Sequence, residues 1–259
     1  GIHICGRAHT NAEGGKGSSE IGGAVYGGND DADNSGTLQY IRLEYTGFAF
    51  DEEHEANGIS FYGVGNGTIV DHCQAYKGSD DGFEFFGGSV NVSNLVAVSC
   101  SDDSFDWTEG WNGKGTNLVA YQEDKSTLGY DCDCLMECDN NGSNNAATPV
   151  AHPVLKNLIL VGNGGSKQGI RLRAGTEVEI DNAKVCGKGQ PLTVETALTE
   201  NALKNGTSKL TNITLTSELS SKEGIYTHAD FIAVTSNKVD ANLSYISFCL
   251  LYTSPSPRD

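Results

Sequence analysis

Residues Ser79–Trp107 read SDDGFEFFGGSVNVSNLVAVSCSDDSFDW, and the end of this stretch repeats its beginning. The turn Ser79–Asp81 returns 22 residues later as Ser101–Asp103. In both places the turn is followed by a Gly or Ser and then by an apolar–polar–apolar triplet, Phe83–Phe85 (FEF) or Phe105–Trp107 (FDW). A repeat of this length is typical of solenoid proteins, in which each copy forms one coil.

The Gly or Ser with its triplet occurs at five places along the chain. These are Gly58–Phe61, Gly82–Phe85, Ser104–Trp107, Gly129–Cys132 and Gly169–Leu172. The first four begin 24, 22 and 25 residues apart, and the last gap of 40 residues contains the loop Asp139–Ala151. Between the triplets lies a second apolar run that begins with an asparagine, at Asn94, Asn117, Asn157 and Asn182. Stacked amides can hydrogen-bond along the solenoid axis, so we predict an asparagine ladder.

Strands of four to six residues at this spacing cannot bury an apolar face alone, whereas stacked coils bury a continuous interior. An antiparallel sandwich would need hairpin dipeptides and would show no longer period. A doubly wound fold would need a helix between strands, and only Thr193–Lys204 reads as helical. The sequence therefore predicts an all-β fold, a right-handed single-stranded parallel β-helix with one short helical insertion near residues 193–204.

Several segments also resemble one family in wording and order, among them Tyr40–Gly47 (YIRLEYTG), Ser79–Ser89 (SDDGFEFFGGS) and Gly169–Gly175 (GIRLRAG). The chain resembles exported right-handed parallel β-helix repeat proteins of Gram-negative bacteria, which are often lipid-anchored and have a pectate-lyase-like solenoid. The likeness covers roughly residues 1–248. It implies an exported protein with further coils before Gly1, but it supplies no agreed activity and no catalytic residues.

The last eleven residues, 249–259 (CLLYTSPSPRD), resemble a translated sequencing adapter, so we set them apart as a non-native tail. The expected domain is then a β-helix over residues 1–248, truncated at both ends. Seven cysteines remain once Cys249 is excluded, and an odd number spread over a large domain is not a disulfide framework. Cys132, Cys134 and Cys138 have no histidine at zinc-like spacing, so we interpret them as core thiols in a strand rather than as a metal site.

The composition limits the partners. The formal net charge of -17 argues against nucleic acid and against anionic membranes. The sequence has no run of 18 apolar residues and thus no expected transmembrane segment. We expect a monomer outside the cytoplasm, either on the outer-membrane surface or secreted.

The middle residue of each triplet should point outward, which predicts a surface column of Ser60, Glu84, Asp106, Asp131 and Arg171. Carboxylates on coils about 4.8 Å apart repel one another, so one pKa should rise or a cation should sit between them. Glu84, Asp106, Asp131 and Arg171 are therefore our candidate catalytic residues, with Arg173 near the substrate. Adjacent coils approach the carboxyl spacing of retaining glycosidases, and alternate coils approach that of inverting ones. The alternative is a solvated acidic stripe capped by Arg171.

A second acidic cluster lies in the repeated turns, at Asp80, Asp81, Asp102 and Asp103. Several carboxylates close together suit Ca²⁺, although aspartates in turns also bond their own backbone. We expect no required cofactor and name Ca²⁺ as the candidate ion.

Aromatic residues near predicted loops offer surfaces on which sugar rings stack, and we place Trp111, Tyr62 and Tyr121 among them. The sequence thus favours an extracytoplasmic surface protein, a binding or adhesion module for a polysaccharide or cell-surface glycan. The alternative is a polysaccharide lyase or glycoside hydrolase that uses the stacked carboxylates. The sequence leaves open whether the protein is an enzyme.

Overall fold

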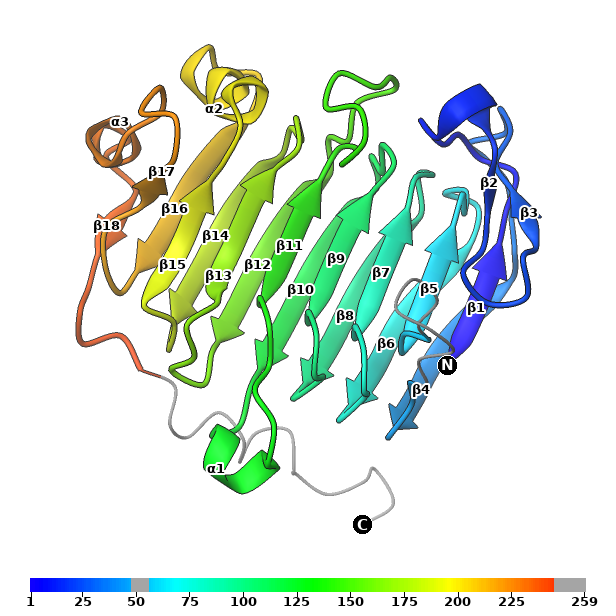
Figure 1. The fold of residues 1–259 in the computed structure, drawn as a ribbon, viewed down its shortest axis with the longest axis horizontal. Coiled ribbons are helices and arrows are strands. Elements are labelled where there is room, and N and C mark those ends of the chain that lie inside the picture. Colours follow the sequence, from blue (N-terminus) through cyan, green and yellow to red (C-terminus); the bar gives the residue numbers. More distant parts are fainter. Residues whose placement is uncertain (48–55, 245–259) are drawn as a thin grey trace.

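A computed structural model describes residues 1–47 and 56–244 of the chain. Two eight-stranded parallel sheets form two faces of a solenoid, and successive coils add one strand to each sheet (Figure 1). The predicted parallel β-helix is confirmed. The adapter-like tail, residues 249–259, lies outside the described residues.

The first sheet has the order β1-β5-β7-β9-β11-β13-β15-β17 and contains the triplets. Its strands are β1 (Ile2–Cys5), β5 (Ile59–Tyr62), β7 (Phe83–Phe86), β9 (Phe105–Thr108), β11 (Met136–Asp139), β13 (Gln168–Arg173), β15 (Gln190–Val194) and β17 (Ser220–Ser221).

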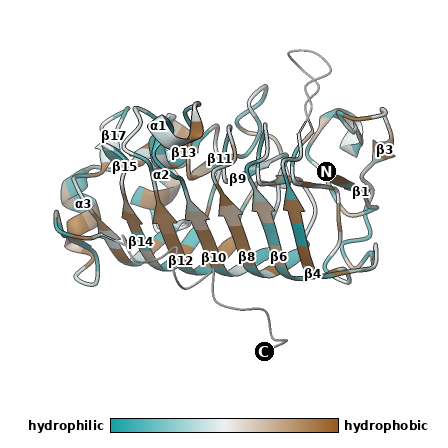
Figure 2. Ribbon diagram, turned by 90° about the horizontal axis from the view of Figure 1, so that it is seen from below, coloured by the Kyte–Doolittle hydropathy of each residue, from teal (hydrophilic) through white to brown (hydrophobic). Residues whose placement is uncertain are grey.

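The second sheet has the order β18-β16-β14-β12-β10-β8-β6-β4 and contains the asparagine runs. Its strands are β4 (Thr37–Glu44), β6 (Ile69–Tyr76), β8 (Asn91–Val98), β10 (Lys114–Tyr121), β12 (Val154–Val161), β14 (Glu179–Cys186), β16 (Lys209–Leu215) and β18 (Lys238–Val239). Hydrophobic residues follow this sheet from coil to coil (Figure 2).

The interior is aromatic where the triplets stack, because equivalent residues of neighbouring coils lie in register. Phe83 stacks on Phe105 with ring centroids 5.5 Å apart, and Phe61 stacks on Phe85 at 5.0 Å. Each such pair contributes about 0.5–1.5 kcal/mol beyond the burial of its area.

The asparagine ladder is confirmed. Asn117 donates from Nδ2 to Oδ1 of Asn94 at 2.9 Å, Asn157 to Asn117 at 3.0 Å, and Asn182 to Asn157 at 2.9 Å. All four residues have a positive φ of 54–63°. Asparagine tolerates this left-handed conformation better than most residues, so the backbone bend and the amide ladder both favour it here.

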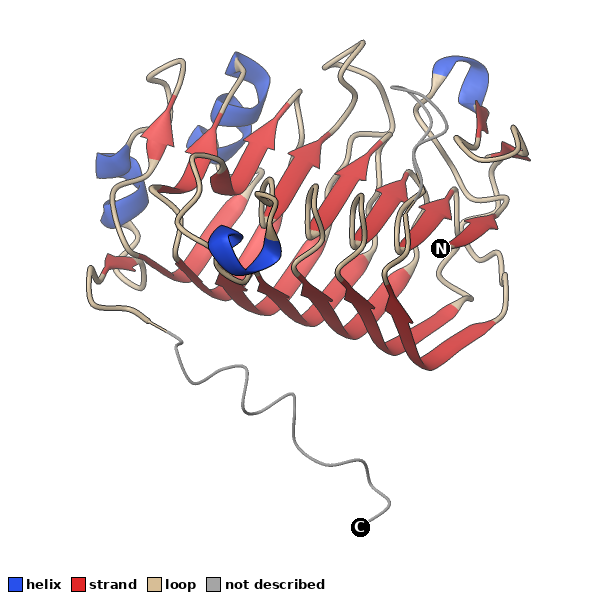
Figure 3. Cartoon of the chain, turned by 60° about the horizontal axis from the view of Figure 1, so that its bottom comes forward, coloured by secondary structure: helices blue, strands red, loops and turns tan. Residues whose placement is uncertain are grey.

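Short helices lie on the loops outside the two sheets (Figure 3). They are α1 (Lys125–Leu128), α2 (Ala197–Lys204) and α3 (His228–Ala233), beside a short 3₁₀ turn at Glu13–Gly15 and a small hairpin of β2 (Gly17–Ser18) and β3 (Val25–Tyr26). The predicted helix over 193–204 begins only at Ala197, because Thr193 and Val194 belong to β15 and pair with β17. No helix among the described residues is long and apolar enough to cross a membrane.

Cys5, Cys73, Cys100, Cys132, Cys134 and Cys138 are free thiols, and all of them except Cys5 are buried. The prediction that Cys132 and Cys134 lie in a strand is wrong. They belong to the irregular segment between α1 and β11, and only Cys138 lies in that strand.

Candidate functional site: an acidic cavity on the first sheet

The two acidic clusters that the sequence separates form one cavity. The turns before β7 and β9 contribute the four aspartates, and the middle residues of β7, β9 and β11 contribute Glu84, Asp106 and Glu137. Glu84 lies opposite Asp106 in the register, and Asp106 lies opposite Glu137. The turn precedes its strand by only one or two residues, so its side chains reach the same outer surface as the middle residue of the strand.

The cavity has a volume of about 320 Å³. It is lined by Glu20, Asn57, Asp80, Asp81, Glu84, Asp102, Asp103, Asp106, Asp133, Glu137 and Arg171. Nine carboxylates therefore face a single arginine in this lining.

Hydrogen bonds between coils fix the carboxylates of the turns. The Asp103 N–H donates to Asp81 Oδ1 at 2.8 Å, and one coil further the Cys134 N–H donates to Asp103 Oδ1 at 2.6 Å. Asn57 Nδ2 donates to Glu84 Oε2 at 2.5 Å and to Ser60 Oγ at 3.0 Å. The acidic groups are thus held rigidly by backbone and amide donors.

Several of the carboxylates are shielded from solvent, although the alternative of a solvated acidic stripe stays open. Asp81 and Asp103 are each 6% exposed and Glu84 is 8% exposed. Asp106 is half-buried, but its Oδ1 atom is buried and has no hydrogen-bond partner. A buried acceptor without a donor is costly unless a proton or a cation satisfies it.

Burial raises the pKa of Asp81, Glu84, Asp103 and Asp106 well above the ordinary range. The next cause is the charge of a neighbouring carboxylate: Asp103 acts on the pKa of Asp81, and Asp106 acts on the pKa of Glu84. These groups therefore hold protons more tightly than exposed carboxyls do.

Basic side chains compensate the cavity at Glu137 and at Asp133, where Lys167 Nζ lies 2.5 Å from Asp133 Oδ2. Arg171 Nη1 contacts Glu137 Oε1 at 2.8 Å and its Nε contacts Glu195 Oε1 at 3.2 Å. Arg173 pairs with Asp139 at 2.7 Å and also with Glu137. The excess of negative charge therefore lies toward the turns of β7 and β9, away from both arginines.

Three groups of carboxylates in the cavity could hold a metal ion, because the members of each group offer one oxygen within 4.8 Å of the others. They are Asp80, Asp81 and Asp102; Asp81, Glu84 and Asp106; and Asp102, Asp103 and Asp133. Ca²⁺ takes six to eight oxygen ligands at about 2.3–2.6 Å and tolerates irregular geometry. The donors fit that ion, and the buried Asp106 Oδ1, which has no hydrogen-bond partner, could serve as one of its ligands.

Comparison with known families agrees with this architecture. The family described as "Pectate-lyase like beta helix domain" matches residues 1–246. The chain belongs to this family. No curated protein and no solved structure gives a significant match. Membership of the pectate-lyase-like β-helix family fits a carbohydrate-associated function in general terms.

In this pectate-lyase-like β-helix, Asp131 does not lie in the acidic column, so its predicted position is wrong. Asp131 is exposed in the loop after α1, where it accepts a hydrogen bond from Asn163 Nδ2 at 3.0 Å. The strand of this coil is β11, and Glu137 occupies the expected place between Asp106 and Arg171. The inserted helix α1 delays the strand, which displaces the triplet that the spacing had favoured.

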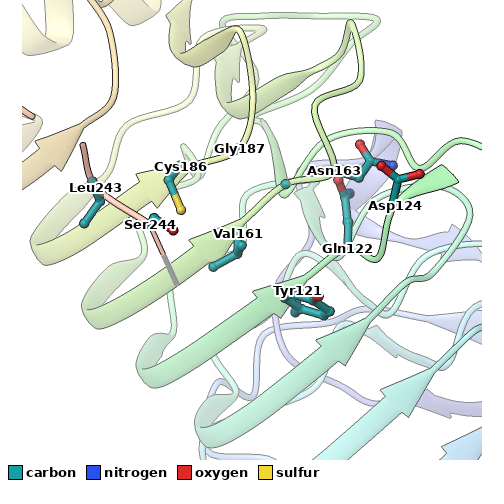
Figure 4. A pocket seen from close by; sticks show the side chains of 10 residues that line it. Tyr121, Gln122, Asp124, Val161, Asn163, Cys186, Gly187, Leu243 and Ser244 are labelled. Carbon is teal, nitrogen blue, oxygen red and sulfur yellow. The ribbon is translucent and has the colours of Figure 1, made fainter. Parts of the chain in front are cut away.

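The aromatic prediction fails at two of three positions. Trp111 is 1% exposed and stacks inside the solenoid on Phe85, with ring centroids 4.1 Å apart. Tyr62 is completely buried. Tyr121 is half-buried and lines a different hollow of about 370 Å³ on the second sheet, together with Val161 (Figure 4). None of the three tyrosine or tryptophan side chains lines the acidic cavity.

Of the remaining candidate site residues, all except Arg173 line the acidic cavity. Asp80, Asp81, Asp102 and Asp103 line the cavity with Glu84, Asp106 and Arg171, whereas Arg173 lies outside its lining. Sequence reasoning missed Glu20, Asn57, Asp133 and Glu137. Met136–Cys138 (MEC) is itself an apolar–polar–apolar triplet, so the sequence pattern could have identified Glu137. Glu20 lies in the segment after β1, which matches no repeat of the sequence.

Proposed function

We propose that the protein is an extracytoplasmic, carbohydrate-associated surface module that binds Ca²⁺ in its acidic cavity and recognises an anionic polysaccharide there. The observation that carries this proposal is the buried, unpartnered Asp106 Oδ1 in a cavity where nine carboxylates face one arginine. The family match supports the carbohydrate class of ligand.

Charge balance favours a cation over protons alone. Carboxylates within 4.8 Å of one another in a shielded site repel strongly, and protonation of four of them would still leave the lining negative. A divalent ion offsets two of these negative charges and gives Asp106 Oδ1 the positively charged partner that it lacks.

An anionic sugar fits the same cavity once the cation is bound. Ca²⁺ commonly keeps ligand positions beyond those that a protein fills, and a uronate carboxylate is an oxygen ligand of the same kind. Arg171 adds a planar donor group at the cavity wall, and such groups match carboxylates. A neutral sugar would gain neither contact.

A polysaccharide lyase or glycoside hydrolase is the second candidate. Glu84 and Asp106 lie on adjacent strands and have a raised pKa, as a general acid at neutral pH requires. They belong to a group whose nearest oxygens lie within 4.8 Å of one another, and retaining glycosidases hold their two carboxyl groups about 5–5.5 Å apart. Product release from the polysaccharide distinguishes this candidate from a binding module.

Calorimetry with Ca²⁺ tests the cation, using Asp81→Asn and Glu84→Gln against Asp131→Asn as a matched control. We expect heat of binding for the wild type and the control, and at least a tenfold weaker Kd for the two cavity variants. Absence of heat, and no change of melting temperature with Ca²⁺, would overturn the cation site.

Retention on an immobilised polyuronate, with Ca²⁺ or with EDTA, tests the ligand. We expect retention with Ca²⁺ and its loss with EDTA, without soluble products. If unsaturated or reducing-end products appear, and Glu84→Gln or Asp106→Asn abolishes them, the enzyme candidate replaces the binding module.

A further inference from the structure

The asparagine ladder of the second sheet gives way to aromatic rings in the first two coils. Tyr40 on β4 lies opposite His72 on β6, which in turn lies opposite Asn94 at the start of the ladder. Both residues keep the left-handed bend, with φ of 56° and 52°. Their rings stack with centroids 4.9 Å apart.

A tyrosine at this position is unfavourable for the fold. A left-handed backbone strains a bulky L-residue more than asparagine, and the ring cannot supply the amide bond of the ladder. Tyr40 is 77% exposed, so burial does not offset this strain and only its ring contact with His72 does so in part. Strain that stability does not explain is a reason to look for function at the same place.

A second exposed tyrosine with a left-handed backbone, Tyr45, directly follows the last residue of β4. Tyr45 has a φ of 52° and is 69% exposed. Its ring meets Tyr76 of the next coil edge-on, with centroids 5.8 Å apart. Tyr45 lies five positions after Tyr40, which corresponds to at most about 17 Å along a strand.

Polar groups occupy the surface between the two tyrosines. The Arg42 guanidinium lies over the Tyr76 ring, 4.7 Å from its centroid. It donates from Nη1 to Gln74 Oε1 at 2.8 Å and from Nε to Glu44 Oε1 at 2.5 Å. This aromatic platform, Tyr40, Arg42, Glu44, Tyr45, Gln74 and Tyr76, thus alternates ring faces with hydrogen-bonding groups.

A groove of about 520 Å³ with a mixed polar and apolar lining starts at Gln39, the residue before Tyr40, and crosses β6, β8 and β10. Its lining includes Gln39, Asp71, Ser93, Lys114 and Thr116. The side chains carry amide, hydroxyl, carboxylate and ammonium groups, and these bond well to hydroxyl-rich ligands. The groove extends the surface from one coil to the next.

We infer that this platform and groove form a second glycan-binding surface, which takes a neutral polysaccharide chain without a cation. Sugar rings present C–H faces that pack on exposed tyrosines and hydroxyls that bond to arginine and amides. The charge of Arg42 is matched by Glu44, so the platform selects a neutral ligand although the whole chain carries a net charge of -17. The inference goes beyond the proposed function, because it concerns the other sheet.

A chain bound here would need several contacts at once. The span between the tyrosines suits an oligosaccharide rather than a single ring. A protein partner would need a larger apolar centre than the exposed tyrosines supply.

Affinity electrophoresis in EDTA, in gels with a soluble neutral glucan, mannan or xylan, tests the inference. We expect at least one glycan to retard the wild type and the exposed-residue control Leu198→Ala equally. Tyr40→Ala and Tyr45→Ala should each weaken the Kd at least tenfold. Asp81→Asn, which disables the proposed cation site, should bind the neutral glycan normally.

The decisive variant is Tyr40→Asn, which suits the left-handed backbone and removes the ring. We expect a melting temperature above that of the wild type together with the loss of glycan retardation. The inference is overturned if none of the three glycans retards the wild type, if Tyr40→Asn binds normally, or if it melts at a lower temperature. Each of these results leaves the Ca²⁺ calorimetry of the acidic cavity unaffected, so the two proposals fail separately.

Discussion

Glu84 and Asp106 lie opposite each other on adjacent parallel strands, and each raises the cost of ionising a carboxylate beside it. They are partners in the register of β7 and β9, and the charge of Asp106 is the main neighbouring cause of the raised pKa of Glu84, after burial. Two like charges held together by the main-chain register cannot separate without breaking the sheet. The fold itself therefore maintains an electrostatic repulsion that a bound cation would relieve.

Replacement of one member of this pair should stabilise the metal-free protein. Asp106→Asn removes a charge and supplies an amide, so we expect stabilisation of about 1 kcal/mol, or a rise of about 2–4 °C in melting temperature in EDTA. The same change removes a ligand and should weaken Ca²⁺ binding about tenfold. Thermal melts in EDTA and in Ca²⁺ measure both effects. Asp131→Asn should change neither the melting temperature in EDTA nor Ca²⁺ binding. If Asp106→Asn melts at a lower temperature than the wild type in EDTA, the carboxylates do not destabilise the metal-free fold.

The stability of the metal-free protein should fall as the pH rises from 5 to 8. The folded-state pKa values of Asp81, Glu84, Asp103 and Asp106 lie above their ordinary values of 3.8 and 4.5, so the folded state binds more protons than the unfolded state. Their contribution is complete below the unfolded pKa and is lost as the pH rises through the folded pKa.

Carboxylates whose pKa is lowered in the folded state do not change this dependence between pH 5 and 8. Hydrogen bonds from Asn94 and Ser93 lower the pKa of Asp71 to about 2, so this group is ionised in both states above pH 5. Melting temperatures across pH 5–8, with EDTA and with Ca²⁺, give the measurement. We expect a decline in EDTA that Ca²⁺ reverses, and a flat or rising curve in EDTA would show that the cavity acids ionise freely.

Much of the architecture follows from the repeat, because one coil must stack on the next to bury its triplet. The turn aspartates and the middle residues of β7 and β9 were identified in this way, since a solenoid places equivalent residues in one column. Glu137 lies six residues after Asp131, because the loop and helix α1 between β10 and β11 obey no period, so the spacing favoured Asp131 instead. Glu20 and Trp111 depend on excursions between coils, whose paths are set by tertiary packing and not by local pattern.

Glu200 should act as the anchor of the loop after β17. This carboxylate is completely buried and accepts hydrogen bonds from Ser221 Oγ and from the N–H groups of Glu223, Ile225 and Tyr226. Burial alone would raise the pKa of Glu200, but these donors lower it. Because each bond to a charged group contributes about 1.5–3 kcal/mol, we expect Glu200→Ala to lower the free energy of unfolding by about 3 kcal/mol.

Urea unfolding and limited proteolysis test the Glu200 anchor. Cleavage within residues 221–226 should appear in Glu200→Ala before global unfolding, because the loop loses its common acceptor. The exposed Glu218 provides the matched control, and Glu218→Ala should unfold like the wild type. Equal stability of the two variants would mean that water replaces the carboxylate.

The asparagine ladder allows its two contributions to be separated at Asn117. This residue has a φ of 58°, donates to Asn94 and accepts from Asn157. Asn117→Gly keeps the backbone bend at little cost but loses both amide bonds, whereas Asn117→Ala loses the bonds and strains the backbone. We expect losses in the free energy of unfolding of about 1–2 kcal/mol for Gly and about 1 kcal/mol more for Ala. Urea unfolding measures both, and a Gly variant as stable as the wild type would show that only the bend, and not the ladder, requires asparagine.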